Sequence, residues 1–60
     1  MIKLNYYLKK FNKTSQWLSN ETGIPKKTID CYRIGTREPS FSNGLKISKA
    51  LNIEPYNLIK

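Results

Sequence analysis

The sequence predicts an all-α fold, a compact domain of five short helices, and three observations predict it. Apolar residues recur three and four positions apart along much of the chain, which is the period of one helical face. Residues suited to a helix end, Gly23, Gly35 and Asn52, follow three of these segments. No stretch alternates polar and apolar residues long enough to predict a strand. At 60 residues the chain has room for one hydrophobic core, so we expect one domain over residues 1–60.

The amino-terminal part of the chain predicts two helices. The first lies in the segment "IKLNYYLKKF" and ends near Asn12, because lysines occupy one face and the other face carries Leu4, Tyr7, Leu8 and Phe11. Thr14 can cap the second helix through its hydroxyl, and Gly23 ends it after about two turns.

A third helix is expected after a tight corner at Ile24 and Pro25. Proline has a fixed φ and no N–H to lose at a helix start, so the segment "KKTIDCYRI" can run as a helix as far as Gly35. The spacing of Ile29 and Tyr32 turns both side chains inward.

Two further helices are expected after the loop "TREP". Ser40 can cap a fourth helix over residues 41–51, and Asn52 can end it in the left-handed conformation. The segment "EPYNLI" predicts a short fifth helix that closes over the core with Leu58 and Ile59. Helical spacing assigns seven residues to the core, including the two named above: Leu18, Ile24, Ile29, Tyr32, Leu45, Ile47 and Leu51.

The charge predicts a polyanionic partner. Eleven Lys and Arg residues oppose four Asp and Glu residues, for a formal net charge of +7. A hydrophobic content of 38% is sufficient for folding, so disorder is not expected. The basic residues fall into two groups, Lys3, Lys9, Lys10, Lys13 and Lys26, Lys27, Arg33, Arg37. The alternative is that this charge only keeps the surface solvated.

Composition argues against catalysis, metal binding and membrane insertion. Cys31 is the single cysteine and there is no histidine, so neither an internal disulfide nor a zinc site is expected. The four carboxylates are scattered, which leaves no visible acid–base pair. We therefore expect a non-enzyme without a cofactor or small-molecule ligand. Apolar runs are too short for a membrane span or a signal peptide, which predicts a cytoplasmic location.

The second and third expected helices, joined by a tight corner, describe a helix-turn-helix. From about Leu4 to Leu58 the sequence resembles the phage repressor and Cro family of DNA-binding domains. The residues that carry the resemblance are "TSQWLS", "TGIPKKTIDCYRIGTREPS" and "LKISKALNIEPYNLI".

The resemblance implies that the front of the third helix faces base edges in the major groove of duplex DNA. Lys26, Lys27 and Thr28 would lie first, and Cys31 one turn further along. Lysine can donate to guanine O6 and N7, and a threonine methyl can contact a thymine methyl. The lysines could instead contact phosphate or solvent. Cys31 could equally be a small filler or a bystander, and no redox role is assigned to it.

Phosphate contacts are expected where helices begin, because backbone N–H groups and hydroxyls point outward there. The candidates are Thr14, Ser15 and Gln16 at the second helix, Ser42 and Asn43 at the fourth, and Arg37 in the loop between the third and fourth helices. Thr14 would be needed as a cap even without DNA. Arg33 lies to the side of the reading face, so we expect it to be solvated.

Several positions depart from the family pattern, namely Ser15, Pro25, Arg33 and Gly44. Where family members often join the first two helices by an ion pair, this chain has Leu8 and Trp17, so we expect an apolar contact and a largely buried Trp17. Gly44 leaves space in a helix interior, and Trp17 or Phe41 are expected to fill part of it.

By this resemblance the chain is a bacterial or phage transcriptional regulator, with repression as the expected mode. One recognition helix covers few base pairs, which favours a homodimer on DNA with half-sites roughly 34 Å apart. The expected contact is the C-terminal region, with Ile53, Tyr56, Ile59 and the loop before the fourth helix. Two alternatives remain: a protein-interaction module such as an antitoxin or anti-repressor, which exposed Tyr6, Tyr7 and Tyr56 would favour, and non-specific nucleic-acid binding through charge.

Overall fold

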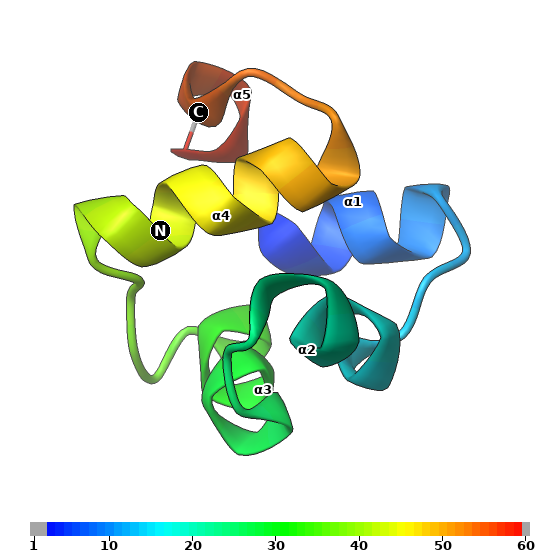
Figure 1. The fold of residues 1–60 in the computed structure, drawn as a ribbon, viewed down its shortest axis with the longest axis vertical. Helices are drawn as coiled ribbons and strands as arrows, with labels where there is room; N and C mark the ends of the chain where they lie inside the picture. Colours follow the sequence, from blue (N-terminus) through cyan, green and yellow to red (C-terminus); the bar gives the residue numbers. More distant parts are fainter. Residues whose placement is uncertain (1–2, 60) are drawn as a thin grey trace.

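Five α-helices make up most of the chain (Figure 1), as the sequence predicts. The computed structural model describes residues 3–59, with only the backbone of Ile59. The helices are α1 (Leu4–Lys10), α2 (Ser15–Thr22), α3 (Lys26–Ile34), α4 (Phe41–Leu51) and α5 (Pro55–Ile59). Residues 3–59 contain no strand. The all-α prediction is confirmed, and every helix end lies within two residues of its predicted place.

The predicted local signals set the helix ends. Thr14 caps α2 and Ser40 caps α4, because each hydroxyl oxygen accepts a hydrogen bond from the backbone N–H three residues further on, at 3.0 and 3.2 Å. Gly23, Gly35 and Asn52 follow α2, α3 and α4 with φ of 79°, 87° and 58°. Positive φ suits glycine, and asparagine tolerates it, so each of these residues reverses the chain direction.

All five helices contribute to one core. α2 packs against α3 and α4, α4 packs against α5, and α1 packs against α3. Figure 1 shows α4 crossing between α5 on one side and the α2–α3 pair on the other. A hydrogen bond from the Lys3 N–H to the Leu58 carbonyl, 2.7 Å long, ties the start of α1 to α5. The buried apolar residues are Leu4, Leu8, Leu18, Ile24, Ile29, Tyr32, Ile47, Leu51 and Leu58.

The prediction that Leu45 belongs to the core is wrong. Leu45 is 40% exposed, because α4 directs Ile47, Ser48 and Leu51 inward and Leu45 lies to the side of that stripe. Ser48 is on the buried stripe instead, and its hydroxyl donates to the Leu45 carbonyl at 3.0 Å. The hydrogen bond compensates the loss of water around that hydroxyl.

Two aromatic residues are less buried than predicted. Phe11 is 38% exposed, because α1 ends at Lys10 and Phe11 lies beyond it, stacked on Tyr7 at 6.0 Å between ring centroids. Trp17 is half-buried at the edge of the core rather than largely buried. In α2 the buried stripe is Ser15 and Leu18, and the ring of Trp17 lies beside that stripe.

No helix within residues 3–59 is both long enough and apolar enough to cross a membrane.

Candidate nucleic-acid interface

Side-chain hydrogen bonds fix the corner between α2 and α3. The Ser19 hydroxyl donates to the Ile24 carbonyl at 2.6 Å, and the Thr22 hydroxyl accepts from the Ile24 N–H at 3.2 Å. Thr22 also donates to the Leu18 carbonyl at 2.7 Å. Ile24 itself is buried. The corner is therefore anchored on both sides, and it sets the direction in which α3 leaves α2.

The side chains of α3 form three stripes along the helix, because residues three, four and seven apart share a face. The first stripe, Ile29 and Tyr32, is buried. The second contains Lys26, Asp30 and Arg33, and the third contains Lys27, Cys31 and Ile34. The third stripe points farthest from the core, since Ile34 is 74% exposed.

The structure places the four predicted base-reading residues around the front of α3. Lys26 and Lys27 are exposed, and Thr28 and Cys31 are half-buried. Lys27 and Cys31 share the outermost stripe, whereas Thr28 lies on the opposite side of the helix from Lys26. The first turn of α3 therefore presents the ammonium groups of Lys26 and Lys27 at the surface, whereas Thr28 and Cys31 are less accessible.

Lys26 is paired along the helix with Asp30. Its Nζ lies 3.1 Å from Asp30 Oδ2, and the two side chains are 53% and 47% exposed. A hydrogen bond from the Ser15 hydroxyl, followed by the bond from Lys26 and the charges of Lys26 and Arg33, holds the pKa of Asp30 below its ordinary value of 3.8. Asp30 is therefore ionised at neutral pH, and its carboxylate lies between α2 and the predicted reading residue.

Arg33 joins three helices, which corrects the expectation that it is solvated. Its Nε and Nη2 donate to Asn5 Oδ1 of α1 at 3.0 and 2.8 Å, and its Nη1 donates to Ser15 Oγ of α2 at 2.9 Å. The guanidinium is half-buried. We call Asn5, Ser15, Asp30 and Arg33 the polar seam.

The side chain of Ser15, a predicted phosphate residue, is buried in the polar seam. Ser15 is only 4% exposed, and its hydroxyl oxygen accepts a hydrogen bond from Arg33. Its interaction with Asp30 is the largest cause of the lowered pKa of that carboxyl. A phosphate contact by Ser15 stays a prediction, and its backbone N–H at the first position of α2 is the group that would make it.

The neighbours of Ser15 remain accessible. Thr14 and Gln16 are exposed. The Thr14 oxygen accepts from the Trp17 N–H, as a cap should, and its hydroxyl proton is free to point outward. The side chain of Gln16 donates to Asn20 Oδ1 at 3.0 Å. The start of α2 therefore keeps two polar side chains at the surface beside α3.

A compact turn places Arg37 next to the end of α3. The backbone N–H groups of Gly35, Thr36 and Arg37 all point at the Cys31 carbonyl, at 3.0, 3.1 and 3.5 Å. Gly35 makes this possible because its φ of 87° is in the left-handed region. Arg37 is exposed. The two exposed lysines at the start of α3 and the exposed Arg37 after its end therefore place positive charge at both ends of the helix.

The two predicted phosphate residues of α4 face different ways. Asn43 is half-buried, and its Nδ2 donates to the Tyr32 hydroxyl of α3 at 3.1 Å. Ser42 is exposed and lines a hollow that also includes Leu45, Lys46 and Ile53. Of these two residues only Asn43 faces α3, and its side-chain amide is already hydrogen-bonded to Tyr32.

Sequence reasoning missed three residues of α3. Asp30 was not considered, although its i,i+4 spacing from Lys26 is a local signal for their pairing. Arg33 was expected to be solvated, because its partners Asn5 and Ser15 lie on α1 and α2 and no local pattern predicts them. Ile34 carried a usable signal, since it lies seven residues after Lys27 and so shares its face. An exposed isoleucine there gives the outer stripe an apolar end.

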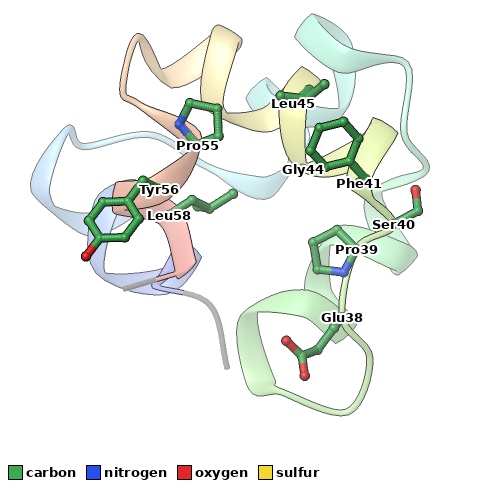
Figure 2. A pocket seen from close by; sticks show the side chains of 9 residues that line it. All are labelled: Glu38, Pro39, Ser40, Phe41, Gly44, Leu45, Pro55, Tyr56 and Leu58. Carbon is green, nitrogen blue, oxygen red and sulfur yellow. The ribbon is translucent and has the colours of Figure 1, made fainter.

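A second exposed feature, an apolar surface, lies between α4 and α5, away from the front of α3. Figure 2 shows Phe41 and Gly44 on one side of a hollow and Tyr56 and Leu58 on the other. The hollow has a volume of about 340 Å³. Phe41 is 82% and Tyr56 65% exposed. We define the apolar surface by the residues Phe41, Gly44, Leu45, Pro55 and Tyr56.

The apolar surface corrects one expectation and bears on another. Phe41 and Trp17 do not fill the space beside Gly44, because Phe41 points into solvent and a Cβ on Gly44 would meet no atom within 4 Å. The predicted dimer residue Tyr56 and the loop before α4 border the hollow, and Ile53 is half-buried next to it. The side chain of Ile59 lies outside the described residues.

Comparison with solved structures gives one strong similarity. The crystal structure of a "putative DNA-binding protein" from Bacteroides fragilis matches this chain with a TM-score of 0.93 at 25% sequence identity. The match covers 100% of this chain and 97% of that one. No protein-family model matches the chain, and no curated protein matches its sequence significantly. The similarity supports the five-helix fold over its whole length.

Proposed function

We propose that this chain binds duplex DNA sequence-specifically, with α3 in the major groove, and regulates transcription as a repressor without catalysis or a cofactor. The observation that carries the proposal is the arrangement of α2 and α3. A fixed corner joins them, and the front of α3 carries two exposed lysines in a chain of net charge +7. The description of the Bacteroides fragilis protein as DNA-binding supports the same function.

The proposed contacts divide into two kinds. Lys26, Lys27, Thr28 and Cys31 would face base edges, where lysine can donate to guanine. The start of α2, with Thr14 and Gln16, and Arg37 would contact phosphates on either side. In this arrangement the phosphate contacts fix the register of the domain, and the reading residues supply the preference. The resemblance to the phage repressor and Cro family supports the same division.

We propose further that the domain binds DNA as a two-fold homodimer through the apolar surface. Exposed aromatic side chains beside a hollow are typical of surfaces that another protein covers. A second copy suits this surface because one recognition helix reads few base pairs, and two-fold pairing lets two helices reach half-sites roughly 34 Å apart. The contact is small, so weak association in the absence of DNA is expected.

Selection of bound sequences from random duplex DNA tests the proposal. We expect a motif with two related half-sites. Lys26→Ala and Lys27→Ala should each weaken binding to the selected duplex, and a base contact should relax preference at one base pair by about 1 to 3 kcal/mol. Lys9→Ala is the matched control, because it removes the same charge from an exposed lysine in the last turn of α1 that none of the proposed contacts uses. Unchanged binding by both variants of the α3 lysines would remove α3 from the interface.

The same experiment tests the two alternatives. Binding without any enriched motif, with a steep dependence on salt, would indicate a non-specific nucleic-acid binder. No DNA binding at all would favour a protein-interaction module, for which exposed Tyr6 and Tyr56 are a specific supporting observation. Sedimentation with and without the selected duplex tests the homodimer, and a one-to-one complex on an unsymmetrical site would contradict it.

A further inference from the structure

The predicted reading residue Lys26 is not a free side chain. Its ammonium lies 3.1 Å from the Asp30 carboxylate, one helical turn further along the same stripe. Lysine is a flexible point charge that serves a phosphate as readily as a base edge. A lysine that reads a base therefore needs something to hold it away from the neighbouring phosphates. In this chain the Asp30 carboxylate is close enough to the Lys26 ammonium to provide that restraint.

Asp30 is itself held by the polar seam. The buried Ser15 accepts from Arg33, and Arg33 in turn binds Asn5 of α1 through two nitrogens. Ser15 is also the first cause of the lowered pKa of Asp30. The carboxylate therefore lies beside a hydrogen-bonded group that joins α1, α2 and α3. It forms one end of a continuous polar path that runs from α1 through α2 to the front of α3.

Stability does not explain the pair. Both side chains are about half exposed, and exposed ion pairs contribute little to folding because water and salt screen them. The lysine also precedes the acid in the helix, which is the less favourable order for such a pair. A single carboxylate near the front of a helix that approaches DNA would, in addition, repel phosphates. The position of Asp30 is therefore better explained by what it does to Lys26.

We propose that Asp30 is a positioning residue that gives Lys26 its base preference. The carboxylate holds the ammonium beside the outer face of α3, where it can donate to O6 and N7 of a guanine. It also disfavours a shift of the lysine to a phosphate, because the phosphate would then lie close to the carboxylate. Asp30 is the specificity-determining partner of Lys26 and need not contact DNA. This inference rests on the proposed function.

Equilibrium binding of Asp30→Asn tests the inference, with the selected duplex and with duplexes that each carry one changed base pair. We expect discrimination at the base pair read by Lys26 to fall about fivefold or more. Affinity for unrelated duplex DNA should rise, because a negative charge is removed. Asp30→Glu retains the charge and should retain the discrimination. It is also the second variant if Asp30→Asn does not fold, which circular dichroism would show.

A double-mutant cycle separates positioning from a structural role. Lys26→Ala should abolish discrimination at the same base pair, and adding Asp30→Asn to it should change that discrimination no further. Equal weakening of all duplexes by Asp30→Asn, or unchanged discrimination at every base pair, would overturn the inference while the selected motif still supported the proposed function. Absence of any motif for the unaltered protein would overturn the proposed function and this inference with it.

Discussion

The polar seam and the apolar surface are both partly exposed, yet they differ in how their side chains are satisfied. In the polar seam the guanidinium of Arg33 makes three hydrogen bonds to two other helices. On the apolar surface Phe41 is 82% exposed beside a hollow of about 340 Å³. Hydrogen bonds are directional and fix the angle between helices, whereas apolar contact depends mainly on area.

The difference teaches what each region is suited to do. The polar seam joins the three helices next to the proposed DNA contact, so it can hold α3 in one orientation. The apolar surface leaves the Phe41 ring 82% exposed, so that ring is available for association with a second copy. Substitutions in the two regions should therefore have separable effects, on folding in one case and on assembly in the other.

The largest effect is expected for Arg33→Met. The substitution removes hydrogen bonds from a charged donor and leaves the buried Ser15 oxygen without that partner, so the free energy of unfolding should fall by about 2 to 3 kcal/mol. Urea denaturation measures the change. Arg37→Met is the matched control, because Arg37 is exposed in a loop and its loss should change stability by less than about 0.5 kcal/mol. Equal losses in the two variants would show that the polar seam does not join the helices.

The next effect is expected on assembly, for Phe41→Ser. Burial of this ring against a second copy should be lost, which weakens the homodimer about tenfold or more and leaves the unfolding free energy almost unchanged. Sedimentation on the selected duplex measures it. Tyr6→Ser is the control, because Tyr6 is an exposed aromatic on α1 that does not line the hollow. If Tyr6→Ser weakened association and Phe41→Ser did not, the dimer contact would have to be assigned to α1.

A smaller effect of opposite sign is expected for Gly44→Ala. A Cβ there meets no atom within 4 Å, and alanine is the better helix former, so stability should rise by about 0.5 to 1 kcal/mol. Thermal unfolding measures it. Gly23→Ala is the contrasting control, because its φ of 79° strains any residue with a Cβ and stability should fall. A loss of stability in Gly44→Ala would mean that the hollow beside α4 is closed in solution.

The smallest effect is expected from pH. The pKa of Asp30 is lowered in the folded chain, first by the hydrogen bond from Ser15 and then by Lys26. Its stabilising contribution is therefore complete above the ordinary value of 3.8 and is lost as the pH falls through the lower folded value. Urea unfolding of Asp30→Asn across this range should show a weaker loss on acidification than the unaltered protein. Parallel curves would contradict a lowered pKa of Asp30 in the folded chain.

The sequence predicted some features of the candidate site and not others. The exposure of Lys26, Lys27 and Arg37 was predictable, because a proline corner and two glycines locate α3 and the loop after it. The orientation of Ser15 was not, since helix-start residues usually face outward and here the first residue of α2 faces α3. The base and phosphate contacts themselves stay predictions.

By itself the sequence determined where the five helices begin and end. Caps such as Thr14 and Ser40 and stops such as Gly23 act through hydrogen bonds and backbone angles within about one helical turn, so a single sequence is enough to locate them. Apolar spacing likewise predicted most of the buried face of each helix, with Ile47 and Leu51 as examples in α4.

The tertiary structure alone decided which polar groups meet and which apolar groups stay outside. Arg33 binds residues 18 and 28 positions away in the chain, and Leu45 is 40% exposed although its residue type suits the core. Both outcomes depend on the angles at which helices cross. Those angles arise from the packing of all five helices together, and no short segment of the chain contains that information.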